Sequence, residues 1–316
     1  YISWYYYMKN NLSNIKKAVK ILNKNQCVGI PTETVYGLAA NAYSSDATDK
    51  IFKLKKRPKK NPLIVHYFNL KLLKKDCEIN DNFLKLYKKY SPGPISYILK
   101  LKKKSLISKN VTNKKNTLAV RFPSHRLTRN LLKQLNYPLA APSANISTKI
   151  SPVSKKDVKD EFGRKVKLIL DGGQSKIGVE STIINLIKKP QILRLGGIPK
   201  EQIKKYLNSH LVYIKKSKIN SPGQEKTHYS PYIKLRLNIK KPNRNEAFVL
   251  IKKRKKMNQN YFYLSKKNNL KEAAKNLYKT FRKIKKKKYR FIAIEKIPNR
   301  GIGEAINDRL MRASKF

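Results

Sequence analysis

The stretch Gln26-Cys27-Val28-Gly29-Ile30-Pro31-Thr32-Glu33-Thr34-Val35-Tyr36-Gly37-Leu38 decides how the chain begins to fold. Its first five residues form a short apolar run that ends at a proline, which is typical of a buried strand entering a loop. Two hydroxyls, a carboxylate and a phenol follow, at a place where α/β sheets commonly carry binding residues. From these residues alone, a structural turn explains the pattern equally well.

Predicted strands and helices alternate outward from this stretch. Besides the strand at 26–30, apolar runs predict strands at 63–67, 95–101, 118–122, 138–141, 166–170, 182–187 and 191–195. Helical periodicity and capping residues predict helices at 12–24, 46–54, 83–90, 124–135, 154–162 and 200–207. This alternation predicts a mixed α/β domain of about 210 residues.

A second, smaller α/β domain is predicted at the end of the chain. Residues 218–231 have no periodicity and contain two prolines, so they read as part of a linker. Strands are expected beyond it at 247–251, 261–264 and 290–297, and helices at 270–284 and 304–313. The predicted organisation is an N-terminal extension (1–11), a catalytic domain (12–210), a linker (211–231) and a C-terminal domain (232–316).

The chain opens without an initiator methionine, and Met8 is a plausible true start. The residues before it lack the basic and apolar regions of a signal peptide. No apolar stretch reaches the roughly 18–20 residues of a membrane span, so we expect no membrane partner. Cys27 and Cys77 are expected to be reduced and buried, without metal-ligand spacing around them. We therefore expect a cytoplasmic protein.

The net charge of +56 suggests a nucleic-acid partner at first. However, 60 of the 74 basic residues are lysines spread along the whole chain, and asparagine is abundant too. Both residues have A-rich codons, so compositional drift of the genome is an alternative to selection for binding. From residue 232 onward the net charge is +22. Runs such as 252–256 and 285–288 are more often solvated faces than binding sites.

Several polar motifs interrupt this lysine-rich background. Lys55 and Arg57 follow a predicted helix and could hold phosphate oxygens. Ser143 and Asn145, two residues apart on an extended segment, would point to the same side. His66, at the end of an apolar strand, would by default be a core histidine. The sequence contains no phosphate-binding Walker loop, no dinucleotide fingerprint and no nucleophile elbow.

In their order and spacing, six segments resemble the YrdC-like family, the threonylcarbamoyl-AMP synthases: residues 31–38, 55–66, 118–123, 141–147, 171–182 and 192–197. The resemblance covers about residues 12–210. Ser221-Pro222-Gly223, His228-Tyr229-Ser230-Pro231 and residues 301–313 look like the linker and C-terminal domain of the long form. The resemblance implies a YrdC-like mixed twisted sheet with flanking helices, plus a small C-terminal Rossmann-like α/β domain.

The resemblance also implies an enzyme, a nucleotidyltransferase. Such enzymes join L-threonine, bicarbonate and ATP into L-threonylcarbamoyladenylate and release pyrophosphate. A separate transferase then carries the threonylcarbamoyl group onto tRNA. Mg²⁺ is expected with the ATP, without protein metal ligands and without a tightly bound organic cofactor.

The site residues follow from matching the family's motifs to this sequence. Lys55, Arg57, Ser143 and Asn145 would hold the phosphates and act in catalysis. Further ATP contacts would come from Asn61, Thr117, Ser151 and Arg194, with His228 and Tyr229 as a lid. Threonine would lie near Thr34, His66 and the Ala141 backbone, with its carboxylate on Arg121. Lys56 and Thr148 stand where the family has glycine, which would cause strain if the backbone needs positive φ.

Two other functions compete with this interpretation. One is an RNA-binding module that uses the basic surface without catalysis, because the YrdC-like fold is regarded as able to bind structured RNA. The other is a carbamoyl-transfer enzyme related to hydrogenase-maturation proteins, but that needs acylphosphatase and zinc-finger segments, and the chain has only two cysteines. A further hypothesis is that the C-terminal domain closes the linker over the site.

Overall fold

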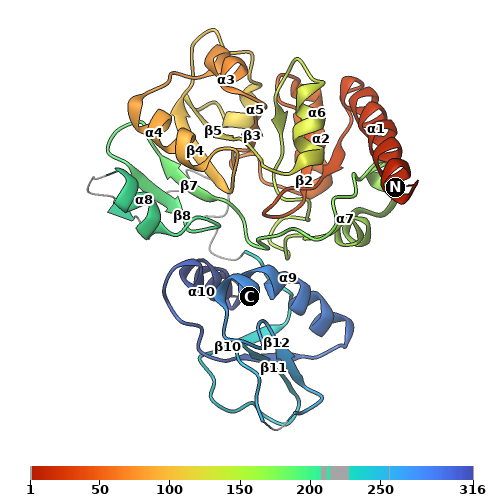
Figure 1. Cartoon of the computed structure of the whole chain (residues 1–316), viewed down its shortest axis with the longest axis vertical. Coiled ribbons are helices and arrows are strands. Elements are labelled where there is room, and N and C mark those ends of the chain that lie inside the picture. The colour runs from red at the N-terminus through yellow and green to blue at the C-terminus, as the bar shows by residue number, and fades with distance from the viewer. Residues whose placement is uncertain (1, 208–211, 214–227, 256, 316) are drawn as a thin grey trace.

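The fold consists of a large sheet domain followed by a small one, seen above and below in Figure 1. We describe it from a computed structural model, which covers residues 2–207, 212–213, 228–255 and 257–315. Residues 211 and 214–227 of the expected linker, with Ser221-Pro222-Gly223, lie outside the described residues. No helix in the described ranges has the length and hydropathy to cross a membrane.

The large domain is built on a nine-stranded mixed sheet with the order β1-β2-β6-β3-β5-β4-β7-β8-β9. Its strands are β1 (Val28–Ile30), β2 (Gly37–Asn41), β3 (Ile64–His66), β4 (Ile95–Lys100), β5 (Thr117–Arg121), β6 (Leu139–Ala140), β7 (Thr182–Asn185), β8 (Gln191–Arg194) and β9 (Val212–Tyr213). Its α-helices are α1 (Ile2–Asn23), α2 (Ser45–Lys55), α3 (Leu70–Asp76), α4 (Asp81–Tyr90), α5 (Lys109–Thr112), α6 (Arg126–Lys133), α7 (Lys155–Phe162) and α8 (Lys200–Leu207). The expected mixed sheet with flanking helices is confirmed.

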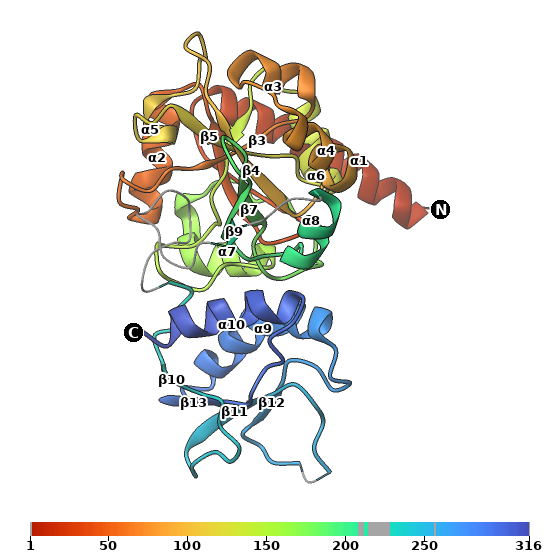
Figure 2. The same cartoon turned by 90° about the vertical axis from the view of Figure 1, so that its left-hand side faces the viewer.

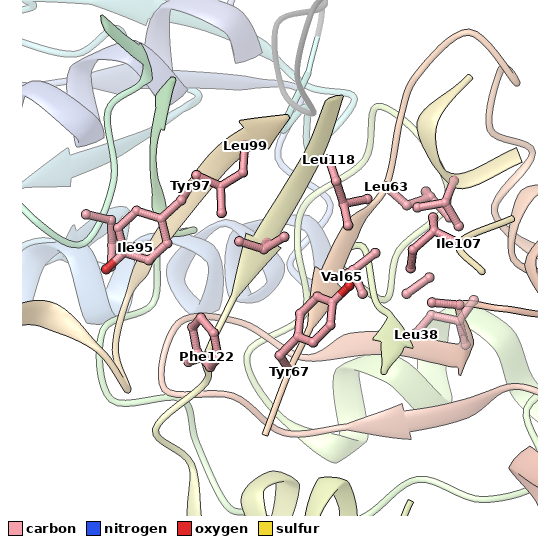
Figure 3. Packing of buried hydrophobic residues seen from close by; sticks show 14 of the residues in the cluster. Leu38, Leu63, Val65, Tyr67, Ile95, Tyr97, Leu99, Ile107, Leu118 and Phe122 are labelled. Carbon is pink, nitrogen blue, oxygen red and sulfur yellow. The ribbon is translucent and has the colours of Figure 1, made fainter. Parts of the chain in front are cut away.

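The largest hydrophobic cluster packs between one face of this sheet and its helices. Figure 3 shows Val65, Tyr67, Tyr97 and Phe122 in it, all fully buried. The Tyr67 hydroxyl donates to the buried Asp76 carboxylate at 2.8 Å, so its polar end is satisfied at the edge of the core. This packing fixes β3, β4 and β5 side by side, which places the carboxyl ends of β3 and β5 next to each other.

The structure corrects several local predictions. Residues 166–170 were expected to form a strand, but among them only Ile169 forms an isolated bridge, to Gly29. Part of the stretch expected to be a loop after Pro31 is strand β2, which pairs with β1 and β6. The short helices α3 and α5 were not expected. Helix α1 begins at Ile2 and runs through the expected boundary at residue 12.

The small domain has a four-stranded, all-parallel sheet in the order β10-β13-β11-β12. Its elements are β10 (Lys234–Leu237), β11 (Glu246–Leu250), β12 (Tyr261–Tyr263), α9 (Leu270–Lys286), β13 (Phe291–Ile294) and α10 (Ile302–Ala313). Figure 2 shows α9 and α10 between this sheet and the large domain. The expected small C-terminal α/β domain is confirmed.

The two domains share a hydrophobic core. Val35, Val153 and Val179 of the large domain belong to the same buried cluster as Leu277 and Phe281 of α9. Gly178 permits this close approach: its φ is +81°, and a Cβ there would lie 2.5 Å from the carbonyl oxygen of Ala274 in α9. The two domains therefore pack as one unit over this contact.

Lys56 and Thr148 both occupy the left-handed backbone region, with φ of +48° and +72°. Lys56 caps the C-terminus of α2 there, with its N–H bonded to the carbonyls of Phe52 and Lys53. A glycine would adopt this conformation without the clash that a Cβ causes. The strain anticipated at these two positions is therefore present in the fold.

We predict that Lys56→Gly stabilises the protein by about 0.5–1 kcal/mol, because it removes left-handed strain from an exposed residue. Denaturant unfolding would measure the change. Lys53→Gly, in the same helix but at an exposed right-handed position, serves as the control and should destabilise by about 1 kcal/mol. If both glycines destabilise equally, the strain at Lys56 is not significant.

Candidate active site

A buried cavity lies where the polar motifs of the large domain meet the segment 228–229. Its volume is about 40 Å³. Eight of the expected site residues line it: Arg57, His66, Arg121, Ala141, Ser143, Arg194, His228 and Tyr229. Thr32, Val35, Tyr36, Gly37, Ile64, Pro142, Glu180 and Ser181 complete the lining.

Backbone hydrogen bonds bring the distant motifs together. The N–H of Leu38 donates to the carbonyl of Pro142 at 2.9 Å, and that of Ala144 donates to Tyr36 at 2.8 Å. On the other side of the motif 141–147, the N–H of Ser147 donates to the carbonyl of Lys55 at 2.8 Å. The three motifs around residues 36, 55 and 143 therefore form one continuous wall.

The Lys55 side chain braces this wall from behind. It is 1% exposed, and its Nζ donates to the carbonyls of Ser143 and Asn145 at 2.6 and 2.5 Å. A buried ammonium needs such acceptors, because its desolvation is costly. Lys55 is not among the residues that line the cavity. The geometry therefore favours a role in which Lys55 holds Ser143 in place and does not itself contact a ligand.

Arg57 reaches the cavity from the loop after α2. Its Nε donates to the carbonyl of Asn61 and its Nη2 to that of Pro62, both at 3.1 Å. These two hydrogen bonds fix the orientation of the guanidinium. Arg57 therefore lies on the cavity wall, which it shares with Ser143.

Arg121 and Glu33 form a buried ion pair at the carboxyl end of β5. Arg121 Nη2 donates to Glu33 Oε1 at 2.7 Å, and Glu33 Oε2 accepts from the N–H of Ser124 at 3.1 Å. Burial alone would raise the pKa of Glu33, but Arg121 outweighs it and holds that pKa below its ordinary value. Arg121 Nε is buried without a partner among the described residues, so the guanidinium keeps a donor for a ligand.

His66 lies opposite Arg121 in the β3–β5 register and is 2% exposed. Its burial, together with the Arg121 charge, lowers its pKa to about 3. The imidazole is therefore neutral at pH 7, and its buried Nδ1 has no partner in the described part of the chain. It can supply a neutral hydrogen bond to a bound molecule.

Arg194 and Ser181 form the opposite wall. Arg194 Nε donates to the carbonyl of Ser181 and its Nη2 to the Ser181 hydroxyl, both at 3.0 Å. Glu180 lies beside them. Its burial would raise its pKa, but Arg309 and Arg194 outweigh burial and hold the pKa of Glu180 at about 2. Glu180 is thus a carboxylate at pH 7.

His228 and Tyr229 fill part of the cavity and are 6% and 1% exposed. Their ring centroids are 3.9 Å apart. The Tyr229 hydroxyl and His228 Nδ1 are buried without partners among the described residues. Burial lowers the pKa of His228 to about 3. Two polar groups are thus held ready for hydrogen bonding inside the site.

The other expected site residues lie outside the lining. The hydroxyls of Thr34 and Thr32 are hydrogen-bonded at 2.8 Å. Of these two residues, Thr32 is the one that lines the cavity.

The remaining expected residues contact other parts of the domain. Ser151 donates to Glu180 at 2.6 Å, and the Asn145 amide donates to the carbonyls of Ile146 and Lys149 in its own loop. Thr117 starts β5, four residues and about 13 Å from Arg121 along the strand. Asn61 is buried beside Arg57.

The polar lining or supporting residues to which the sequence assigned no individual role are Thr32, Glu33, Tyr36, Glu180 and Ser181. They lie inside the motifs 31–38 and 178–182, whose polar composition was noted, but composition does not tell which side chain turns inward. Among the described residues, no group of three or more metal-ligating side chains could hold a metal ion.

Comparisons with known proteins match both domains. The family profile Sua5_yciO_yrdC, described as Telomere recombination, matches residues 20–196. A profile described as Threonylcarbamoyl-AMP synthase, C-terminal domain, matches residues 198–315. The Threonylcarbamoyl-AMP synthases of Pyrococcus abyssi and Bacillus subtilis are each 35% identical; the alignments cover 96% and 97% of this chain and 94% of each relative.

A solved structure is similar over the same length. The crystal structure of P. abyssi Sua5 complexed with L-threonine superposes with a TM-score of 0.87 at 33% identity. The superposition covers 95% of this chain and 94% of that one. Both domains and their relative arrangement are therefore shared with that protein.

We predict that Glu33→Gln destabilises the fold by about 3 kcal/mol at pH 7, because it leaves the buried Arg121 charge uncompensated. The folded-state pKa of Glu33 is lowered, so its stabilising effect is present above the ordinary glutamate pKa and is lost as the pH falls through the lowered value. The stability difference should therefore shrink below about pH 4.

Chemical unfolding at pH 7 and pH 3.5 would measure this difference. Glu78→Gln, in the exposed Lys100–Glu78 pair, is the control and should change stability by less than about 0.5 kcal/mol at either pH. A pH-independent loss in Glu33→Gln would contradict the charge argument.

Proposed function

The chain belongs to the threonylcarbamoyl-AMP synthase family in its two-domain form, and from this premise we propose its reaction. The protein forms L-threonylcarbamoyladenylate and pyrophosphate from L-threonine, bicarbonate and ATP. The product supplies tRNA threonylcarbamoyladenosine modification, through a separate tRNA threonylcarbamoyl transferase. We expect it to act in the cytoplasm, where its buried free thiols Cys27 and Cys77 would stay reduced.

The convergence of Arg57, Arg121 and Arg194 on one buried cavity supports this proposal most strongly. The reaction must bring together a carboxylate, a carbamate and a triphosphate. Their mutual repulsion is large in a site that excludes water. Preorganised guanidinium groups and hydroxyls offset it and stabilise the charge that develops on the phosphate oxygens.

The chemistry needs no covalent protein nucleophile. The amine of threonine attacks the bicarbonate carbon, and loss of water leaves a carbamate. A carbamate oxygen then attacks the α-phosphorus of ATP, the bond to the bridging oxygen breaks, and pyrophosphate leaves. Holding these groups in line accounts for a large part of the rate enhancement that such a site can supply.

Threonine is proposed to bind at the ends of β3 and β5. Its carboxylate meets Arg121, which keeps the buried Nε as a donor. Neutral His66 and the Ala141 backbone lie beside it. Thr34 acts through its hydrogen bond to Thr32.

ATP is proposed to occupy the opposite side, with its phosphates on Arg57, Ser143 and Arg194. Lys55 acts by holding the carbonyls of Ser143 and Asn145. Asn61, Thr117 and Ser151 are proposed as further contacts along the nucleotide. Mg²⁺ would arrive on the phosphates as part of the substrate, and we assign it no protein ligands. His228 and Tyr229 are proposed as a lid that folds over the nucleotide.

Incubation of the protein with ATP, L-threonine and bicarbonate tests the proposal. We expect pyrophosphate release and an adenylate product that both depend on all three substrates. Chromatography with mass detection would identify the adenylate. Pyrophosphate release that is unchanged without threonine would refute the reaction.

Arg57→Ala and Ser143→Ala are expected to lower turnover by about 10²-fold or more, because each removes a preorganised donor from the developing charge. Lys286→Ala serves as the control, since Lys286 is an exposed residue of α9 whose Nζ lies 3.4 Å from Asp160 and which does not line the cavity. Steady-state pyrophosphate assays would compare the three variants. Equal loss in all three would argue against a site at Arg57 and Ser143.

A further inference from the structure

The Glu180 carboxylate is held by residues of both domains. From the large domain, Ser151 donates to Oε1 at 2.6 Å. From the small domain, the Tyr278 hydroxyl lies 3.0 and 3.1 Å from the two carboxylate oxygens, and Arg309 Nε donates to Oε2 at 2.9 Å. Because Glu180 lines the cavity, the small domain reaches the site through this carboxylate.

Arg309 is 1% exposed and contacts more than Glu180. Its Nη2 donates to the carbonyl of Leu195, the residue that follows β8 and Arg194, at 2.8 Å. Its guanidinium carbon lies 4.8 Å from the centroid of the Tyr229 ring, within the range of a cation–π contact. The Tyr278 ring lies 6.1 Å from Tyr229, nearly parallel to it. One side chain of α10 thus contacts two residues that line the cavity, Glu180 and Tyr229, and the residue that follows Arg194.

The charge of Glu180 explains why this contact matters. A carboxylate beside a triphosphate would repel it, and the repulsion is strong in a buried site. Arg309 compensates that charge together with Arg194, which lines the cavity. The Arg309 guanidinium also donates to Asp308 through Nη1 at 2.8 Å. Arg309 is not itself a lining residue, so it acts on the site through Glu180 and Tyr229, which are.

We propose that Arg309, together with Tyr278, is a positioning residue for the nucleotide side of the active site. By holding Glu180, the end of β8 and the Tyr229 ring, it lets the C-terminal domain complete the ATP site without touching the substrates. This inference rests on the proposed function. The sequence suggested only that the C-terminal domain closes the linker over the site. Here its effect on the site is assigned to two side chains, Arg309 and Tyr278, which act through the Glu180 carboxylate.

Other interdomain contacts provide a matched control. Arg282 of α9 donates to the carbonyl of Ile150 at 2.8 Å and lies 3.4 Å from Asp157. Like Arg309 it is an arginine of the small domain that binds a carboxylate and a carbonyl of the large one. Neither Ile150 nor Asp157 lines the cavity. Loss of Arg282 therefore weakens the domain contact without changing the charge at the site.

The experiment compares Arg309→Met with Arg282→Met in the full-length protein. Calorimetric titration with Mg·ATP, without threonine, gives the dissociation constant, and steady-state assays give KM for each substrate. We expect Arg309→Met to weaken ATP binding by about tenfold or more, and threonine KM to change by less than about threefold. Arg282→Met should leave ATP binding within about twofold of the wild type.

A pH series separates positioning from a loss of structure. In the wild type, Arg309 and Arg194 both face Glu180, with the hydroxyls of Ser151 and Tyr278, and Asp308 pairs with Arg309. Without Arg309 only Arg194 opposes the effect of burial, so the pKa of Glu180 rises. The ATP affinity of Arg309→Met, relative to wild type, should therefore increase as the pH is lowered. Glu180→Gln combined with Arg309→Met should bind ATP more tightly than Arg309→Met alone, because the uncompensated charge is gone.

Tyr278→Phe keeps the aromatic ring and removes the hydroxyl that donates to Glu180. It therefore tests the same hydrogen bonds around Glu180 if Arg309→Met does not fold. It should weaken ATP binding by about threefold. Equal ATP affinity in the Arg309 and Arg282 variants, or no gain from Glu180→Gln, would overturn the inference. A wild-type protein that binds ATP but forms no adenylate would refute the proposed function and leave this test of ATP binding intact.

Discussion

The Glu180 carboxylate is the charge on which the arrangement of the two domains depends. A carboxylate at 5% exposure is stable only where donors surround it, and here Ser151, Tyr278 and Arg309 supply them from both domains. The apolar cluster around Val179 and Leu277 buries apolar surface between the domains, but this non-directional contact does not fix how one domain is oriented on the other. The buried carboxylate restricts that orientation, because donors from both domains must lie at hydrogen-bond distance from it.

The net charge of +56 has a different meaning beside the residues that line the cavity. The cavity wall carries three arginines, whereas most lysines lie on the surface, where ion pairs contribute little. Lys55 is the exception among the residues discussed, because it is buried and bonded to two carbonyls. Guanidinium groups suit this wall, since each can bind several acceptors in a fixed plane. Most of the positive charge therefore lies on the solvated surface, away from the residues that line the cavity.

The sequence predicted the fold class from the local alternation of strands and helices, whereas the motifs that meet at the cavity stood out through their resemblance to the YrdC-like family. That resemblance also implied that His66 and Arg121 share one subsite, and the two are neighbours in the β3–β5 register. It did not distinguish Thr34 from Thr32, which is the one that lines the cavity, since a loop's composition does not reveal which of two neighbouring hydroxyls turns inward. The bridge at 166–170 depends on Gly29, a partner distant in sequence. The contact of Arg309 with Glu180 was not predicted for the same reason: the two residues are 129 apart, and the resemblance of residues 301–313 to the long form does not reveal their partners.

The position of His228 and Tyr229 has a kinetic consequence. Both residues are buried and line the cavity, so they take up space beside the proposed nucleotide site. On the proposal that they form a lid, ATP enters only those molecules in which this lid has moved aside. The measured affinity for ATP is then the intrinsic affinity reduced by the fraction of molecules that are open. At high ATP concentration, the rate of association should level off at the rate at which this segment opens.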